Sequence, residues 1–102
     1  MYIEWLRFRV QPELREKFVM VDAEVWTADH VKRKGFLKKE VWISPHNLDE
    51  LAIVITWATA DDWFTIPKPE LEATEAEFAQ AFGGEYKLTE SAAYQVRKTF
   101  QP

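Results

Sequence analysis

The chain has 102 residues, of which 47% are hydrophobic and 15% aromatic, and its formal net charge is -4. This length suits one core, so we expect residues 1–102 to form a single domain. The absence of cysteine excludes disulfides, thiolate nucleophiles, iron–sulfur clusters and thiolate zinc sites. The longest uncharged apolar run, residues 51–60, is much shorter than the roughly 18 residues that span a bilayer, so no membrane contact is expected.

The start of the chain and the distribution of its basic residues bear on two further classes, secreted proteins and nucleic-acid-binding proteins. The N-terminal sequence MYIEWLRFRV reaches an acidic residue at Glu4 and is not a signal peptide, which predicts a cytoplasmic protein. Lysine and arginine are spread along the chain without a dense basic stripe, so nucleic acid is not an expected partner. The one basic cluster, residues 32–39, surrounds a predicted helix end, where the helix dipole favours cations.

The first third of the chain predicts a strand followed by a helix. Residues 2–10 alternate, with Leu6, Phe8 and Val10 on one face and Ile3, Trp5, Arg7 and Arg9 on the other. Pro12 and Glu13 then open a helix of about five turns, whose apolar residues recur at helical spacing: Leu14, Phe18, Val21 and Val25. Gly35 marks its end.

The middle of the chain predicts a β-hairpin with a loop of about six residues. Residues 36–43 alternate, with Leu37, Val41 and Ile43 on one face and Phe36, Lys38, Glu40 and Trp42 on the other. Residues 51–57, LAIVITW, are nearly all apolar and mostly β-branched, which suits a strand buried on both faces. The sequence SPHN between them is typical of a turn and leaves His46 in solvent.

The last third predicts a short helical turn, a second helix and a final strand. Thr59 and Asp62 resemble a capping box. A helix then begins at Pro69 or Glu70 and ends at Gly83-Gly84, with a buried stripe of Leu71, Thr74, Phe78 and Phe82. Residues 86–100 alternate as a long strand in which one parity comprises Tyr86, Leu88, Ala92, Tyr94, Val96 and Phe100.

The order strand, helix, strand, strand, helix, strand predicts an α+β fold of the ferredoxin-like βαββαβ type, with a four-stranded antiparallel sheet. In this fold the helices cover one face of the sheet. The other face would carry tryptophan and further apolar residues, which form too large a patch to leave in water. We therefore expect a second copy of the chain to cover it.

Three stretches carry a resemblance to a known family: IEWLRFRVQPELREKF, GFLKKEVWISP and ITWATADDWFTIPKPELEATEAEF. They resemble a small, uncharacterised and largely cyanobacterial family within the dimeric α+β barrel superfamily, which also holds the antibiotic biosynthesis monooxygenases. The resemblance covers about residues 1–83 and implies a homodimer whose two sheets pack face to face. It also implies that the interior of this dimeric α+β barrel holds a small hydrophobic molecule.

The resemblance also bears on cofactors. Haem-degrading members of the superfamily use a histidine on the second long helix, an asparagine on the first strand and a tryptophan near the short helical turn. Trp63 matches that tryptophan, but the second helix has no histidine and the first strand has no asparagine. The departure argues against haem, and no other cofactor is expected. Cofactor-independent oxygenation, as in the antibiotic-forming members, asks only for a cavity that desolvates the substrate.

Five tryptophans in 102 residues are the most unusual feature of the composition. Aromatic side chains suit stacking against a planar ligand, and they equally suit a core or a dimer interface. Seven residues are therefore candidate ligand-binding residues. Four tryptophans and Tyr94 are the expected walls, and Arg7 and Glu40 are the expected polar anchors. The four tryptophans are Trp5, Trp42, Trp57 and Trp63.

Two residues are candidate catalytic groups. Glu40 lies beside aromatic residues, where desolvation would raise its pKa and suit it to act as a general base; the alternative is an ion pair with Lys38 or Arg7. His30 follows Asp22 and Trp26 at a spacing of four, which places all three on one side of the helix. The alternative for His30 is a helix-terminal histidine that contacts the last carbonyls.

The sequence lacks the motifs of metal sites, phosphate-binding loops and hydrolytic triads. No histidine pattern suggests a metal site, no glycine-rich loop precedes a helix, and no histidine lies at a suggestive spacing from a serine.

Three hypotheses about function follow from the sequence. The first is a homodimeric barrel that binds a small, flat, mostly apolar molecule. The second is a cofactor-independent monooxygenase, and the third is a purely structural or partner-binding dimer. The sequence leaves open whether the chain is an enzyme.

Overall fold

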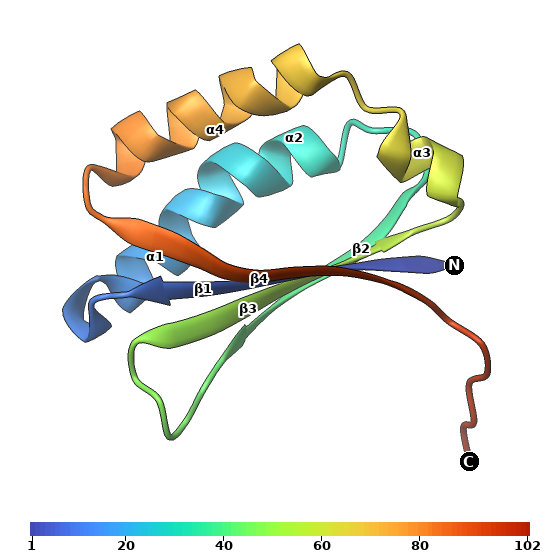
Figure 1. Ribbon diagram of the computed structural model, residues 1–102, viewed down its shortest axis with the longest axis horizontal. Helices are drawn as coiled ribbons and strands as arrows, with labels where there is room; N and C mark the ends of the chain where they lie inside the picture. Colours follow the sequence, from blue (N-terminus) through green and yellow to red (C-terminus); the bar gives the residue numbers. More distant parts are fainter.

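A computed structural model describes residues 1–102 as two layers, a four-stranded sheet with its long helices on one face (Figure 1). The strands are β1 (Tyr2–Val10), β2 (Phe36–Ile43), β3 (Glu50–Trp57) and β4 (Tyr86–Gln95). Their order in the sheet is β2-β3-β1-β4, and every neighbouring pair is antiparallel. The prediction of a ferredoxin-like α+β fold is confirmed.

The first long helix runs continuously from α1 (Arg15–Asp22) through a π-helical segment (Ala23–Thr27) to α2 (Ala28–His30). A 3-10 turn, Pro12–Leu14, precedes it, where the fixed φ of proline favours a helical start. The predicted helix is therefore confirmed. The π-helical segment widens the helix by one residue in the middle, a local change that is frequent at functional sites.

The two later helices follow local signals in the sequence. Before α3 (Ala60–Phe64), the Thr59 hydroxyl oxygen accepts a hydrogen bond from the Asp62 amide at 3.1 Å, which confirms the predicted cap. The second long helix, α4 (Lys68–Phe82), ends at Gly83, whose φ of 71° is left-handed. No helix combines the length and the hydrophobicity that a bilayer span needs.

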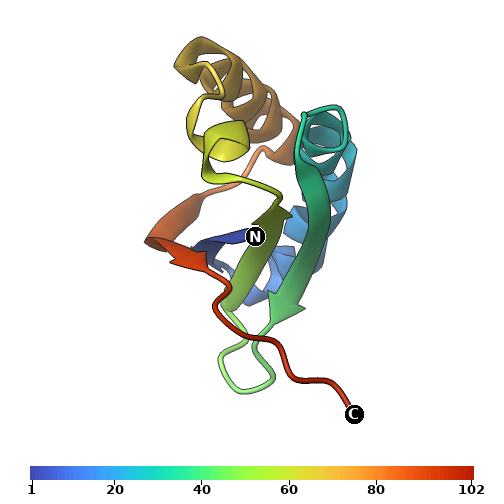
Figure 2. The same ribbon diagram turned by 90° about the vertical axis from the view of Figure 1, so that its right-hand side faces the viewer.

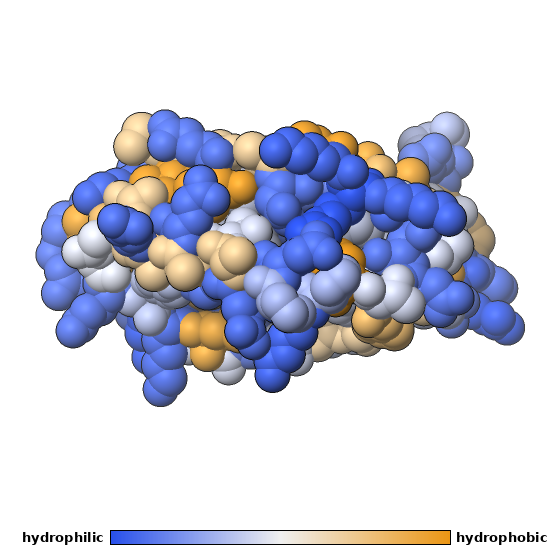
Figure 3. All heavy atoms as spheres, turned by 90° about the horizontal axis from the view of Figure 1, so that it is seen from above, coloured by the Kyte–Doolittle hydropathy of each residue, from blue (hydrophilic) through white to orange (hydrophobic).

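The core lies between the sheet and the two long helices. It consists of buried residues from β1, β3 and both helices: Val10, Phe18, Val21, Val25, Leu51, Ile53, Ile55, Trp57, Phe78 and Phe82. Figure 3 looks onto the helix-covered side, where the outer surface of the helices is mostly hydrophilic with a few hydrophobic patches. The long helices are therefore amphipathic, as their sequence spacing predicts.

A β-bulge in β2 makes one predicted face assignment wrong. Phe36 pairs with Trp57 and Lys38 pairs with Thr56, so Leu37 is an extra residue. Phe36 consequently packs against the core, whereas Leu37 is 52% exposed. Beyond the bulge, Lys38, Glu40 and Trp42 share the face without helices, as predicted. Lys39, which alternates with Lys38 and Glu40, points toward the helices and contacts Asp22.

A second bulge divides the predicted face of β4. Phe8 pairs with Leu88 and Arg7 pairs with Glu90, which leaves Thr89 as the extra residue. Tyr86 and Leu88 therefore lie on the helix side, whereas Ala92 and Tyr94 lie on the outer face, so the prediction of one shared face is wrong. The strand also ends at Gln95 rather than Phe100. Residues 96–102 run away from the body of the fold (Figure 2).

Two glycines with left-handed backbone provide a matched test of the fold. An added Cβ at Gly35 would overlap the Asp62 side chain, whereas at Gly83 it would meet nothing. Gly83→Ala should lower the free energy of unfolding by about 1 to 2 kcal/mol through backbone strain alone. Gly35→Ala should lower it further, because α3 must also shift. Urea denaturation of both variants measures the difference, and equal losses would contradict the contact between Gly35 and α3.

Candidate functional site

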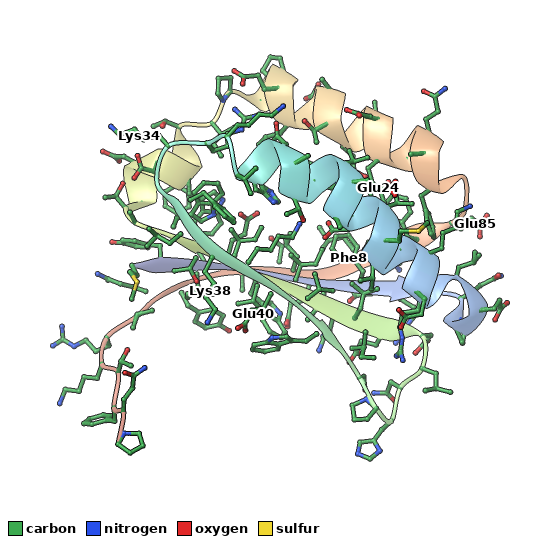
Figure 4. The ribbon with its side chains drawn as sticks, turned by 180° about the vertical axis from the view of Figure 1, so that it is seen from behind. Phe8, Glu24, Lys34, Lys38, Glu40 and Glu85 are labelled. Atoms are coloured by element: carbon green, nitrogen blue, oxygen red, sulfur yellow. The ribbon has the colours of Figure 1, made fainter.

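A cavity of about 270 Å³ lies between the sheet and the helices. Twelve of its 16 lining residues are hydrophobic, and they come from both layers. The aromatic walls are Phe8, Phe18, Trp26, Trp57, Trp63, Phe78 and Tyr86. Figure 4 shows Phe8 in this space, between β1 and the helices. The site is therefore built inside one chain, with flat, apolar surfaces on several sides.

The four remaining lining residues, Glu4, Asp22, His30 and Glu75, are all titratable. Asp22 and His30 come from the first long helix, Glu4 from β1 and Glu75 from α4. Asp22, Trp26 and His30 line the same cavity, which confirms the prediction that their spacing of four places them on one side of the helix.

The side chain of Asp22 forms a buried ion pair with Lys39 of β2. Lys39 Nζ lies 2.8 Å from Asp22 Oδ2, and the two side chains are 5% and 2% exposed. Neither oxygen of Asp22 has a well-aligned hydrogen bond, and Oδ1 has no partner of any kind. Burial raises the pKa of Asp22 and lowers the pKa of Lys39, while the attraction between them opposes both shifts.

His30 is held between aromatic rings and the same lysine. Its ring stacks with Trp26 at 5.5 Å and with Phe36 at 6.3 Å between centroids. Lys39 Nζ lies 3.4 Å from His30 Nδ1, and because an ammonium only donates, Nδ1 is the acceptor. Burial first, and then the positive charge of Lys39, lower the pKa of His30 to about 4. The imidazole is therefore neutral at pH 7.

Glu4 and Glu75 are partnered by aromatic side chains. Trp57 Nε1 donates to Glu4 Oε1 at 3.1 Å, and the Tyr86 hydroxyl donates to Glu75 Oε1. Burial raises the pKa of Glu4, although the hydrogen bond from Trp57 and the charge of Lys39 oppose it. Burial and Glu75 together raise the pKa of Tyr86. These bonds orient two of the aromatic walls.

The predicted ligand-binding residues do not share one cavity. Trp57 and Trp63 line the cavity between the layers. The other five lie on the outer face of the sheet: Trp5, Arg7, Glu40, Trp42 and Tyr94. Trp5 and Trp42 meet there edge to face at 5.8 Å. Arg7 Nη2 lies 3.7 Å from Glu90 Oε2. The anchors and walls chosen from the sequence therefore divide between two surfaces.

Of the two predicted catalytic groups, only His30 lies at the cavity. Glu40 is on the outer face with Lys38 (Figure 4), where Lys38 Nζ lies 3.0 Å from its Oε2 and Trp42 Nε1 donates to its Oε1 at 3.0 Å. Lys38 first, and then Trp42, lower the pKa of Glu40. The expected rise is therefore wrong, because the carboxylate is solvated and hydrogen-bonded rather than desolvated. The expected alternative for Glu40, an ion pair with Lys38, is confirmed.

Sequence reasoning missed Lys39, Tyr86 and Glu75 as parts of a site. Lys39 alternates with Lys38 and Glu40 and therefore lies on the helix side, but a lysine in a run of charged residues carries no sequence signal of burial. Asp22 had a visible signal, its spacing from Trp26 and His30, but as a helical aspartate it was not chosen as an anchor. Its pairing with Lys39 depends on the contact between α1 and β2.

The depressed pKa of His30 predicts a specific loss of stability in acid. Unfolded His30 binds a proton near pH 6.5 but folded His30 only near pH 4, so acidification through this window favours the unfolded state, by about 3 kcal/mol in total. The raised pKa values of Glu4 and Asp22 act in the opposite direction. His30→Gln should therefore flatten the pH dependence of unfolding in urea between pH 6.5 and 4.5. His46→Gln, in the exposed turn, should keep the wild-type slope, and equal slopes for both variants would contradict the burial of His30.

Comparison with known proteins gives no matching family model and no matching curated protein. Solved structures do match. SnoaB from Streptomyces nogalater, a cofactor-independent oxygenase, has a TM-score of 0.69 and 17% identity, with 99% of this chain and 97% of SnoaB covered. A monooxygenase from Streptomyces coelicolor, in complex with nanaomycin D, has a TM-score of 0.72 and 16% identity, with 99% and 91% covered.

A third structure is more similar in sequence. A conserved protein of unknown function from Bacteroides thetaiotaomicron, described as a possible oxidoreductase, is 30% identical, with 91% of this chain and 97% of that one covered and a TM-score of 0.55. A dimeric ferredoxin-like protein also matches. The chain therefore belongs to the same family as the Bacteroides protein and has the fold of the antibiotic biosynthesis monooxygenase-like dimeric α+β barrel proteins.

Proposed function

We propose that this protein binds a small, flat, mostly apolar molecule in the cavity between its sheet and its helices. The observation that carries the proposal is a cavity of about 270 Å³ with aromatic walls, in which Trp57 and Tyr86 are oriented by hydrogen bonds to Glu4 and Glu75. Flat, rigid walls with few polar groups suit a planar ligand. The ligand then lies within one chain rather than between two sheets.

A cofactor-independent monooxygenase is the second candidate function. It is supported by SnoaB and the Streptomyces coelicolor monooxygenase, which share the fold. The cavity also contains His30, whose imidazole is buried and neutral, and Asp22, whose carboxyl group has an unpartnered oxygen. Both could hold or move a proton of a substrate. A shared fold alone does not carry the reaction, so binding remains the primary proposal.

The outer face of the sheet supports a homodimer. It carries Trp42 and Tyr94, which are 48% and 61% exposed, and it has no helix over it (Figure 1). The segment after β4 extends away from the fold and carries Phe100, which is 85% exposed. A second copy of the chain, packed sheet against sheet as in the dimeric α+β barrel fold, would remove these aromatic surfaces from water.

Blocking the cavity should abolish binding. Leu88 lines the cavity and is 48% exposed, so it lies at the opening. In Leu88→Trp the larger ring should occupy the opening without disturbing the core. We expect 2-naphthalenemethanol to raise the melting temperature of the wild type and to quench its tryptophan fluorescence, and both effects to be lost in Leu88→Trp.

The matched control is Leu37→Trp. Leu37 has a similar exposure, 52%, but lies on β2 outside the cavity, so this variant should bind as the wild type does. Loss of binding in both variants would contradict the proposed location. The same proteins test the enzymatic candidate, through oxygen uptake with 1,4-dihydroxynaphthalene above the uncatalysed rate. Monooxygenation would place one oxygen atom in the product and one in water, and Leu88→Trp should stop it.

The homodimer has its own test. Val54 lies in the middle of the outer face, between Trp5 and Glu40 in the pairing of the strands. Val54→Arg should convert the dimer to a monomer, because a charge in a closed interface loses its hydration. Val31→Arg, at an exposed position after α2, is the control and should remain dimeric. Sedimentation velocity measures both, and a monomeric wild type would exclude the homodimer.

A further inference from the structure

The polar lining of the cavity is acidic. Three carboxyl groups, Glu4, Asp22 and Glu75, line it together with one neutral imidazole, His30. The only cation in contact with this set is Lys39, which lies against Asp22. With one ammonium against three carboxyl groups, the site is not balanced in charge when these groups are ionised. A bound anion would therefore meet repulsion, and a bound cation attraction.

One carboxyl group in this set, that of Asp22, is buried without a hydrogen bond to either oxygen. Glu4 accepts from Trp57 and Glu75 accepts from Tyr86, so both have partners. Asp22 is 1% exposed, and its Oδ1 has no partner even though Oδ2 lies beside Lys39. A buried acceptor without a donor is destabilising, and more so when it is charged, so a ligand that donates to Oδ1 would remove this cost and bind more tightly. The free oxygen belongs to a side chain that lines the cavity.

The walls favour the same class of ligand. Aromatic faces attract cations through their negative π-surfaces, and desolvation strengthens this attraction. Trp26, Trp57 and Trp63 line the cavity together with the carboxyl groups. Aromatic faces combined with buried carboxylates are suited to an organic ammonium group on an apolar body. Arg7, which was predicted as a ligand-binding residue, lies on the other face of the sheet and is paired with Glu90.

We propose that the ligand of this cavity is a primary amine with a flat apolar body, whose ammonium group donates to Asp22 Oδ1 while its body lies against the tryptophans. This inference rests on the proposed function and names the chemical class that the cavity selects. It distinguishes the site from one that holds a substrate anion, because an anion would face three carboxyl groups.

Three probes of nearly equal size and shape test the charge preference: 2-naphthylmethylamine, 2-naphthalenemethanol and 2-naphthoate. Calorimetric titration of the wild-type protein at pH 7 should give the tightest binding for the amine, about tenfold tighter than the alcohol, and the weakest for the carboxylate. Leu88→Trp should abolish binding of all three, which excludes attraction of the amine to the negative protein surface.

Two substitutions locate the preference. Asp22→Asn should bring the amine to within about threefold of the alcohol, because the charged acceptor is lost. Since this variant leaves Lys39 without its partner, Glu4→Gln provides a second test: the amide can still accept from Trp57, and the preference should fall with one cavity charge removed. Glu77→Gln, on the exposed side of α4, should keep the wild-type ranking.

The outcomes separate the two proposals. If the alcohol binds in the cavity but the amine binds no tighter, or if the carboxylate binds best, the inference of an amine ligand is overturned and the proposed function stands. If none of the three probes binds, both are overturned. If the ranking holds in the wild type and persists unchanged in Asp22→Asn and in Glu4→Gln, the preference does not come from these carboxylates, and the inference is overturned as well.

Discussion

The buried ion pair between Lys39 and Asp22 joins the two layers of this fold. Lys39 comes from β2 at the edge of the sheet, and Asp22 comes from α1. Both are almost completely buried, and leaving either charge alone would be strongly destabilising. The pair therefore holds α1 over β2. The same ammonium donates to His30, so one buried lysine fixes the positions of both helical groups at the cavity.

Aromatic packing determines where the cavity can form. At one end of the interlayer space, Phe18 meets Phe78, Phe82 and Tyr86 with ring centroids 4.9 to 5.7 Å apart. At the other end, Trp57 meets His30 and Phe36 at 6.2 and 6.0 Å. Residues of both clusters line the cavity, which is the space that they leave between them. Rigid rings in close-packed clusters cannot easily collapse into it.

The element order could be predicted because its signals are local: the Thr59 cap, the left-handed Gly83 and the change of period in each segment. The two bulges could not, because an extra residue is defined by the strand that pairs with it. Leu37 and Thr89 look like ordinary strand residues in the sequence. They decide which aromatic residues face the core, since one places Phe36 on the helix side and the other separates Tyr86 from Tyr94. Arg7 and Glu40 were chosen as anchors because the site was expected in a barrel interior on the face without helices, whereas this cavity lies on the other face.

The two faces of the sheet differ in how their polar groups are satisfied, and this difference indicates separate roles. On the outer face, Arg7 pairs with Glu90, and the indoles of Trp5 and Trp42 donate to Glu90 and Glu40. These polar groups already have partners on the outer face itself. The face is therefore suited to pack against the same face of a second copy. In the cavity, Asp22 Oδ1 has no donor. Because the two surfaces use different residues, the proposed ligand site inside each chain and the proposed contact between chains would not compete, and one sheet would serve both proposals with its two faces.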